Sequence, residues 1–186
     1  MPIATLRRVV FSSDRAKRSS AARSDARPVA DQRDAITMPH QAERRVHDTN
    51  KAGLITPLVA EARRAGAMAY VREGTTRWAA AHVSDVAKLY VLALELGEPG
   101  GRYHASAEEG VAARTIPEAI GQGTGLPVRS VGDDDIEHYF GWMAPFAALD
   151  MTASSTWTQA RLGWKPTDPD LLSDLAEMDY SVPVAV

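Results

Sequence analysis

Hydrophobic and polar positions follow clear periods from Gly53 to the end of the chain. A first helix is predicted where apolar residues share one helical face and Gly66 supplies a stop, at Leu54, Leu58, Val59 and Ala62. The strongest amphipathic pattern follows Ser84 or Asp85, either of which can cap a helix, and it ends at Gly97. Its apolar stripe consists of Val86, Leu89, Tyr90, Ala93 and Leu94.

Shorter apolar runs between the helical patterns predict extended segments at residues 67–71, 77–83, 102–106 and 127–131. Further helices are predicted from 115 to about 121 and at 133–140, 154–162 and 170–178. The helix at 115 opens with Thr115-Ile-Pro-Glu118, which has the spacing of a capping box. Strands and helices that alternate in this way favour an α/β fold.

The first quarter of the chain has a different composition. Residues 1–51 contain 11 Lys and Arg against 6 Asp and Glu, whereas residues 52–186 contain 10 against 18, so the net charge of −3 divides into +5 and −8. No glycine precedes Gly53, and Phe11 is the only aromatic residue before it. Because residues 14–45 show neither period, we interpret residues 1–45 as a basic, poorly ordered extension and residues 46–186 as a C-terminal α/β domain.

Composition also restricts the kinds of site that the chain can carry. It contains no cysteine, which excludes disulfides, thiol nucleophiles and cysteine-ligated metals. No apolar run approaches the roughly 20 residues needed to cross a bilayer, so we expect no membrane contact and a cytoplasmic location. Acidic residues interrupt the basic charges of residues 15–45, and only Phe11 is available for base stacking, so nucleic-acid binding is not favoured.

Four segments carry a resemblance to a known family. They are Gly53-Leu-Ile-Thr-Pro-Leu, Thr76-Arg-Trp-Ala-Ala-Ala-His82-Val-Ser-Asp85-Val-Ala, Arg102-Tyr-His-Ala-Ser-Ala-Glu-Glu-Gly110 and Leu162-Gly-Trp-Lys-Pro166. In this order they resemble the C-terminal, substrate-side part of the extended short-chain dehydrogenases/reductases, in the NAD(P)-dependent epimerase/dehydratase group. The resemblance implies a partial Rossmann-like fold. It also implies relatives that, when complete, transfer a hydride to or from a small alcohol, carbonyl or sugar-like substrate.

The machinery that the resemblance implies is absent from this sequence. The family binds NAD(P) through a glycine-rich turn between its first strand and helix, but no glycine precedes Gly53. Gly121-Gln-Gly123-Thr-Gly125 lies between a predicted helix and a predicted strand, the reverse order, so we interpret it as a helix stop and connection.

The family's acid/base pair, a Tyr four residues before a Lys, is missing as well. The residues four positions before the four lysines are Ser13, His47, Ser84 and Arg161. We therefore assign no catalytic residue and no cofactor-binding residue, and we expect no cofactor to bind this chain alone. By resemblance, NAD(P) belongs to the complete relatives.

Three residues are candidates for substrate contacts: Arg77, Trp78 and His82. An Arg near Arg77 binds phosphate in nucleotide-sugar relatives, since a guanidinium matches a phosphate bidentately. Trp78 fits a pocket wall or the core, and His82 fits a substrate contact or a hydrogen-bonded structural position. The acids at 133–135 are explained by a helix start, and no histidine has a partner at metal-ligand spacing, so no metal site is predicted.

Two functional hypotheses stay open. In the first, the chain is the substrate-side part of an oxidoreductase or epimerase and is inactive alone. In the second, it is a truncated, non-catalytic module that binds a ligand or partner. Either way, a half-sheet with a free edge is expected to associate with itself or with a complementary fragment. An altered start or a displaced reading frame is a further hypothesis for the residues before Val46.

Overall fold

The computed structural model describes residues 9–11, 36–38, 46–49 and 53–181 of the 186-residue chain. The strands are β1 (Val9–Phe11), β2 (Ile36–Met38), β3 (Val46–His47), β4 (Met68–Val71), β5 (Arg77–His82), β6 (Glu108–Ala112) and β7 (Val128–Val131). The α-helices are α1 (Ile55–Ala65), α2 (Val83–Leu96), α3 (Thr115–Thr124), α4 (Ile136–Phe140), α5 (Ala144–Ala147), α6 (Thr156–Leu162) and α7 (Leu171–Glu177). Short 3₁₀ turns cover Asp133–Asp135 and Gly141–Met143.

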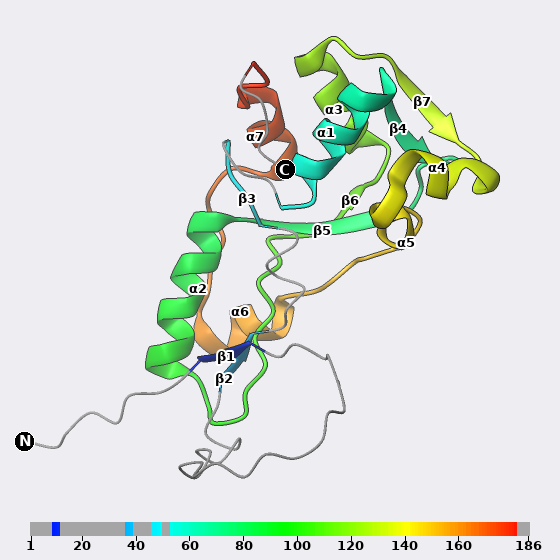
Figure 1. The fold of residues 1–186 in the computed structure, drawn as a ribbon. Helices are drawn as coiled ribbons and strands as arrows, with labels where there is room; N and C mark the ends of the chain where they lie inside the picture. The colour runs from blue at the N-terminus through cyan, green and yellow to red at the C-terminus, as the bar shows by residue number, and fades with distance from the viewer. Residues whose placement is uncertain (1–8, 12–35, 39–45, 50–52, 182–186) are drawn as a thin grey trace, which may run out of the picture.

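Strand β5 runs between two groups of helices and strands. It pairs in parallel with β3 and antiparallel with β6, while β4 pairs in parallel with β7 and β1 with β2. In Figure 1, α1, α3, α7, β4 and β7 lie on one side of β5, and α2 and α6 lie on the other. The mixed α/β fold expected from the alternating pattern is therefore confirmed.

Each side of β5 has its own hydrophobic core. The larger core includes Trp78 and Ala80 of β5 together with Ile120 of α3 and Leu175 of α7. Among the side chains that the structure describes, the smaller core contains five buried residues, Leu89, Ala93, Tyr103, Leu162 and Trp164. With so few members, the smaller core depends heavily on its largest side chain, the indole of Trp164.

Helix α2 begins differently from the sequence-based expectation. His82, still in extended conformation, is the N-cap residue, and its Nδ1 accepts a hydrogen bond from the Ser84 N–H at 3.2 Å. The prediction that Ser84 or Asp85 caps this helix is wrong, because β5 runs directly into α2 and its last residue takes the cap position. Asp85 lies fully buried inside the first turn, where its carboxylate bonds a distant loop.

Two further local predictions are wrong. The strand expected at 102–106 lies further along, as β6, because Glu108–Ala112 is the segment that pairs with β5. The capping box at the start of α3 does not form: the Thr115 hydroxyl donates to the Ala112 carbonyl at 2.8 Å, and Glu118 pairs with Arg114 at 2.7 Å. Helix α3 itself is present and extends to Thr124, three residues beyond the predicted end.

The remaining predicted elements agree with the structure to within one or two residues at their ends, except that the first three residues of the helix predicted at 133–140 form a 3₁₀ turn before α4. These are the helices α1, α2, α4, α6 and α7 and the strands β4, β5 and β7. The predicted extension, residues 1–45, lies mainly outside the described residues. Within it the structure describes the backbone of β1 and β2, whose pairing no sequence period indicated.

Glycines at the end of α3 allow close packing. Gly125 ends the helix in the left-handed conformation at φ 73°, which confirms the interpretation of this motif as a helix stop. A Cβ at Gly121 would meet the Val128 side chain, and one at Gly123 would overlap the Tyr180 ring. The motif therefore brings α3 against β7 and against the segment that follows α7.

We expect Gly123→Ala to destabilise the protein by about 1–3 kcal/mol, although alanine is the better helix former by about 1 kcal/mol. The reason is that the new methyl group displaces the Tyr180 ring, which is anchored by its hydroxyl to the Leu175 carbonyl at 2.8 Å. Urea unfolding measures the change. Gly132→Ala is the matched control, since nothing lies within 4 Å of its added Cβ, and an equal loss in both variants would contradict this explanation.

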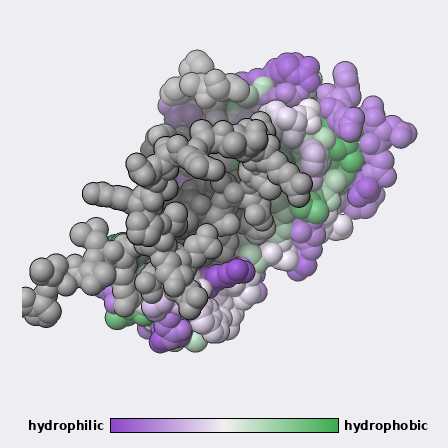
Figure 2. All heavy atoms as spheres, turned by 60° about the horizontal axis from the view of Figure 1, so that its bottom comes forward, coloured by the Kyte–Doolittle hydropathy of each residue, from purple (hydrophilic) through white to green (hydrophobic). Residues whose placement is uncertain are grey.

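Several large hydrophobic side chains remain at the surface. Those more than 50% exposed are Val91, Leu96, Trp142, Leu149 and Trp157. Figure 2 shows hydrophobic residues reaching the surface among hydrophilic ones near the right edge of the molecule, which is the side of α4 and α5 in Figure 1. None of the helices in the described ranges is long and apolar enough to cross a membrane.

Candidate functional site

The candidate site lies at the carboxyl ends of two parallel strands. The pairing of β3 with β5 places His47 directly beside His82, each at the end of its strand. Their rings meet edge to face with centroids 5.7 Å apart. In open α/β sheets, ligands bind in the crevice outside the carboxyl ends of the strands, so this position is where a ligand site is expected.

Two carboxylates complete the cluster. Asp174 of α7 lies with Oδ2 2.5 Å from His47 Nδ1 and 3.7 Å from His82 Nε2. Glu108 of β6 lies with Oε2 3.8 Å from His47 Nε2. Four titratable groups from four different elements thus converge, and we call His47, His82, Glu108 and Asp174 the strand-end cluster.

Burial sets the electrostatics of the strand-end cluster. His47 and Asp174 are almost fully buried, and His47 Nε2 has no hydrogen-bond partner. Burial raises the pKa of the Glu108 carboxyl, and the hydrogen bond from the Leu171 N–H at 2.8 Å and the nearby His47 ring only partly oppose this. The cluster therefore combines two imidazoles with two carboxylates, which are the side chains that most often serve as general acids and bases.

His82 has a defined orientation in the cluster. Because its Nδ1 accepts a hydrogen bond from the Ser84 N–H, the neutral ring carries its proton on Nε2, which faces Asp174. The gap of 3.7 Å between Nε2 and the carboxylate is too long for a direct hydrogen bond. The His82 side chain is 15% exposed, against 1% for His47, 2% for Asp174 and 25% for Glu108.

We expect Asp174→Ala to destabilise the protein by about 2–3 kcal/mol, because it leaves His47 Nδ1 buried without its charged partner. The loss should appear both in urea unfolding and as faster hydrogen exchange of the α7 amides, since Asp174 fastens α7 to the strand ends. Asp179→Ala, an exposed aspartate just beyond the same helix, is the control. Unchanged exchange in α7 would show that the His47 contact does not hold this helix.

The structure does not bring the three predicted substrate residues together. Arg77 and His82 occupy opposite ends of β5, a separation of roughly 17 Å at the rise of a strand. Arg77 is exposed and pairs with Asp150 at 3.1 Å. The Trp78 ring lies in the larger core, with its Nε1 buried and without a hydrogen-bond partner. Only His82 belongs to the strand-end cluster.

Sequence reasoning missed three members of the strand-end cluster: His47, Glu108 and Asp174. They lie far apart in the chain, and none stands in a spacing typical of a catalytic or metal motif. No apolar run marks His47 either, because Val46 is preceded by Arg44 and Arg45. Within the described part of the chain, no three His, Asp or Glu side chains are grouped so that they could hold a metal ion.

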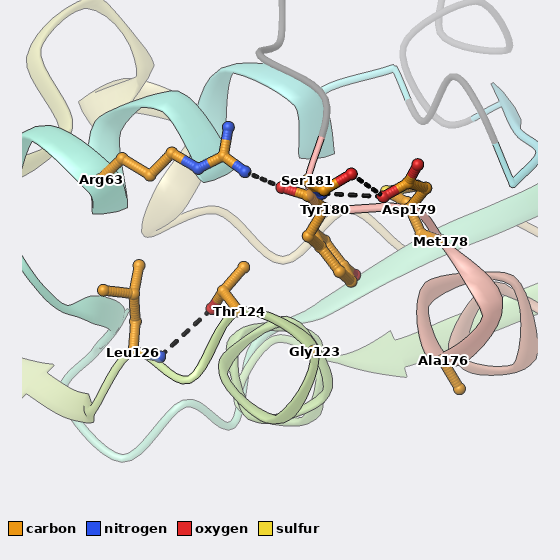
Figure 3. A pocket seen from close by; sticks show the side chains of 9 residues that line it. All are labelled: Arg63, Gly123, Thr124, Leu126, Ala176, Met178, Asp179, Tyr180 and Ser181. Atoms are coloured by element: carbon orange, nitrogen blue, oxygen red, sulfur yellow. Dashed lines mark hydrogen bonds between the residues drawn. The ribbon is translucent and has the colours of Figure 1, made fainter.

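A separate surface pocket lies between the end of α3, the Arg63 side of α1 and the segment after α7 (Figure 3). Its volume is about 570 Å³. Its polar groups are largely engaged with one another: Arg63 donates to the Tyr180 carbonyl, and Asp179 accepts from the Ser181 hydroxyl and N–H. The pocket therefore offers no converging set of unpaired polar groups.

The described residues do not fit the phosphates of a nucleotide. The space beside Gly121 and Gly123 of the glycine-rich motif is already occupied by the Val128 and Tyr180 side chains. Both glycines also lie at the carboxyl end of α3, where the partial negative charge of the helix disfavours an anion. We therefore derive no chemical step through a dinucleotide bound to these residues.

Two curated proteins are similar in sequence, and no protein-family profile matches the chain. An uncharacterized protein of Schizosaccharomyces pombe is 40% identical over 135 residues, covering 73% of this chain and 46% of its own length. An uncharacterized protein of Saccharomyces cerevisiae is 38% identical over 137 residues, covering 74% and 46%. The chain therefore spans about half the length of the curated relatives that it matches.

Solved structures with a similar fold include enzymes that act on nucleotide sugars. The dTDP-glucose 4,6-dehydratase of Streptomyces venezuelae, with NAD and TYD bound, aligns with a TM-score of 0.53 at 16% identity over 78% of this chain and 42% of its own. The ADP-L-glycero-D-manno-heptose-6-epimerase of Helicobacter pylori aligns with a TM-score of 0.54 at 14% identity, over 77% and 42%. At these identities the likeness shows the fold: this chain resembles the C-terminal part of Rossmann-like short-chain dehydrogenase/reductase enzymes.

Proposed function

We propose that the chain is the substrate-side part of a protein in the NAD(P)-dependent epimerase/dehydratase group. Complete members transfer a hydride between NAD(P) and an alcohol or carbonyl carbon of a small or sugar-like substrate. The observation that carries the proposal is the pair of parallel strands ending in His47 and His82, where α/β enzymes of this kind place their ligands. The fold likeness to dehydratases and epimerases supports the same assignment.

His82 is the substrate-side residue that the geometry favours among the three predicted from the sequence. Its Nε2 lies 3.7 Å from the Asp174 carboxylate, too far for a direct hydrogen bond, so the Nε2–H is left to donate to a hydroxyl of the ligand. Arg77 stands at the other end of the strand and is already paired, and Trp78 is buried in the core. In this proposal, Arg77 and Trp78 stabilise the strand and His82 orients a hydroxyl of the ligand.

The chain alone is proposed to be catalytically silent and cytoplasmic. The acid/base pair of the family needs a Tyr four residues before a Lys, and none of the four lysines has one. The strand-end cluster brings imidazoles and carboxylates together, and none of these side chains is itself a hydride donor or acceptor. The absence of cysteine is consistent with a reducing compartment.

A titration and a chimera test the two halves of this proposal. Titration of the chain with NADH and NADPH, followed by fluorescence of its four tryptophans, is expected to show no saturable binding. In the chimera, the matched residues of this chain replace the corresponding 135 residues of the Schizosaccharomyces pombe relative. It is expected to fold and to bind NADH within about tenfold of the relative's own affinity.

Micromolar binding of either cofactor by the chain alone would overturn the proposal that the chain is inactive on its own. A relative that binds NADH while its chimera folds but does not bind would overturn the family assignment. The second candidate function, a non-catalytic binding module, is favoured by one observation: helix α2 exposes the large hydrophobic side chains of Val83, Val91 and Leu94.

A further inference from the structure

Helix α2 is capped by a side chain that can change its charge near neutral pH. The N-cap residue of a helix is most often Ser, Thr, Asp or Asn, whose oxygen accepts a hydrogen bond from one of the first backbone N–H groups. In α2 this residue is His82, and its Nδ1 accepts from the Ser84 N–H at 3.2 Å. An imidazole nitrogen accepts only while it carries no proton, and histidine ordinarily gains its second proton between pH 8 and pH 5. The cap of α2 therefore depends on protonation, which a serine or asparagine cap does not.

Protonation of His82 removes this cap. A proton on Nδ1 stands in the line of the Ser84 N–H, so two donors face each other and the hydrogen bond is lost. The positive charge also lies at the N-terminus of a 14-residue helix, where the partial positive charge of the helix disfavours it. The charged ring is thus driven away from the position that it holds as a cap.

A second position for the charged ring lies on the side of its other nitrogen. His82 Nε2 is 3.7 Å from Asp174 Oδ2. A movement of about 1 Å brings these two atoms to the distance of a charge-assisted hydrogen bond. Asp174 Oδ2 already receives His47 Nδ1, and a carboxylate oxygen has room for two such partners. The neutral ring therefore gains most from Ser84, and the charged ring gains most from Asp174.

The titratable groups around His82 come from every element packed against β5. Strand β3 contributes His47, β6 contributes Glu108, α7 contributes Asp174 and α2 contributes Asp85. The carboxylates of Glu108 and Asp174 favour a charged His82, whereas a proton on His47 opposes it, because the two rings are 5.7 Å apart. The Asp85 carboxylate is already held by a lysine and two backbone N–H groups. Asp174 is therefore the partner within reach of the charged ring.

We infer that His82 is a two-position pH switch at the start of α2. When neutral, His82 accepts from the Ser84 N–H and caps the helix. When protonated, it leaves Ser84 and pairs with Asp174. The switch follows from the contacts of the described residues, whereas its effect on a ligand rests on the proposed function. The Nε2–H that donates to a ligand hydroxyl at neutral pH is taken by Asp174 in acid, so ligand binding is expected to weaken as the pH falls.

Nuclear magnetic resonance of the full chain, labelled with nitrogen-15 and titrated from pH 8 to pH 5, tests the switch. The His82 ring is expected to change from the neutral form, with its proton on Nε2, to the doubly protonated form. With the same midpoint, the protection of the Ser84 amide against hydrogen exchange, corrected for the intrinsic pH dependence of exchange, is expected to fall about fivefold. The amide of Leu94, near the other end of α2, should keep its protection.

Two outcomes of this titration would overturn the inference. In the first, the His82 ring stays neutral down to pH 5. In the second, the ring becomes charged while the Ser84 amide keeps its protection, or the amides of Ser84 and Leu94 lose theirs together. Either result would mean that the cap does not respond to the charge of His82.

The variant His82→Asn separates the titration of this ring from that of its neighbours. Asparagine is a good N-cap residue and does not titrate, so the Ser84 amide of the variant is expected to keep its protection from pH 8 to pH 5. His138→Asn removes an exposed histidine of α4 and is the matched control, which should behave as the wild type. Loss of Ser84 protection in acid despite His82→Asn would assign the effect to another group and refute the switch.

The tests of the switch and of the proposed function are independent. The nuclear magnetic resonance readouts involve neither ligand nor cofactor, so a chimera that binds NADH beside an unresponsive Ser84 amide would refute the switch alone. A responsive Ser84 amide beside a chimera that folds without binding NADH would refute the function alone.

Discussion

Trp164→Ala is expected to destabilise the protein by about 3–5 kcal/mol. The indole is 1% exposed and is the largest member of the smaller core, which has five buried residues among those that the structure describes. Its Nε1–H donates to the Asp85 backbone carbonyl at 2.9 Å, so truncation removes this hydrogen bond as well as the packing. Urea unfolding followed by far-ultraviolet circular dichroism measures the loss, because it does not rely on tryptophan fluorescence.

Trp142→Ala is the matched control for Trp164→Ala. The same atoms are removed, but Trp142 is 66% exposed, so the expected change is below about 1 kcal/mol. Equal losses in the two variants would mean that the smaller core is not closed around Trp164. A large loss for Trp164 alone would establish that α2 and α6 are held by this side chain.

Asp85→Ala is expected to destabilise the protein by about 2–4 kcal/mol. The Asp85 carboxylate is fully buried and accepts hydrogen bonds from the Thr167 and Asp168 N–H groups at 2.9–3.1 Å and from Lys88 at 3.1 Å. Removing it leaves the two backbone donors of Thr167 and Asp168 without their acceptor. Asp133→Ala, which breaks an exposed ion pair with Arg72, is the control and should change stability by less than about 1 kcal/mol.

The lowered pKa of Asp85 also predicts that the stability of the protein depends on pH, with a definite sign. Burial by itself would raise the pKa of Asp85, but the hydrogen bonds from Asp168, Thr167 and Lys88 outweigh it and hold the pKa below its usual value. The folded state therefore favours the ionised form. The stabilisation is complete above the unfolded pKa of about 3.9 and is lost as pH falls through the lower folded value.

The difference in unfolding free energy between the wild type and Asp85→Ala measures this contribution. Unfolding free energies taken from pH 7 down to pH 3 should differ by a constant amount above about pH 5, and the difference should shrink below that. A difference that grows on acidification would mean that Asp85 is held protonated in the folded protein. Asp85→Asn, which keeps one oxygen acceptor, should retain part of the stability and lose most of the pH dependence.

Local sequence was a good guide wherever one segment decides its own structure. The stop at Gly66 and the apolar positions of α1 follow from helix geometry and from the conformational freedom of glycine, both of which act within a few residues. The wrong predictions concern segments whose structure depends on contacts with distant parts of the chain. The Thr115 hydroxyl turned back to Ala112 instead of capping α3, and β6 formed at 108 because that is where the chain lies against β5.

The residues of the candidate site also fall into those that the local sequence identified and those that it did not. His82 was identified because it stands in a segment with a recognisable resemblance, and its position at the end of β5 agrees with the predicted strand. His47, Glu108 and Asp174 were not, since their convergence depends on three elements meeting β5 from different parts of the chain. Arg77 and Trp78 stand next to each other in sequence, yet the pleat of the strand sends one to solvent and the other to the core.

The sequence by itself therefore determined the α/β class, most element boundaries, the absence of a Tyr-x-x-x-Lys pair and the reversed context of the glycine motif, because these depend on period, composition and spacing. Only the tertiary structure decided that Asp85 fastens a loop some 80 residues away, that Gly123 is filled by Tyr180, and that four titratable groups meet at the strand ends. Contacts between residues so far apart arise from packing of whole elements, and no local pattern encodes which partners they bring together.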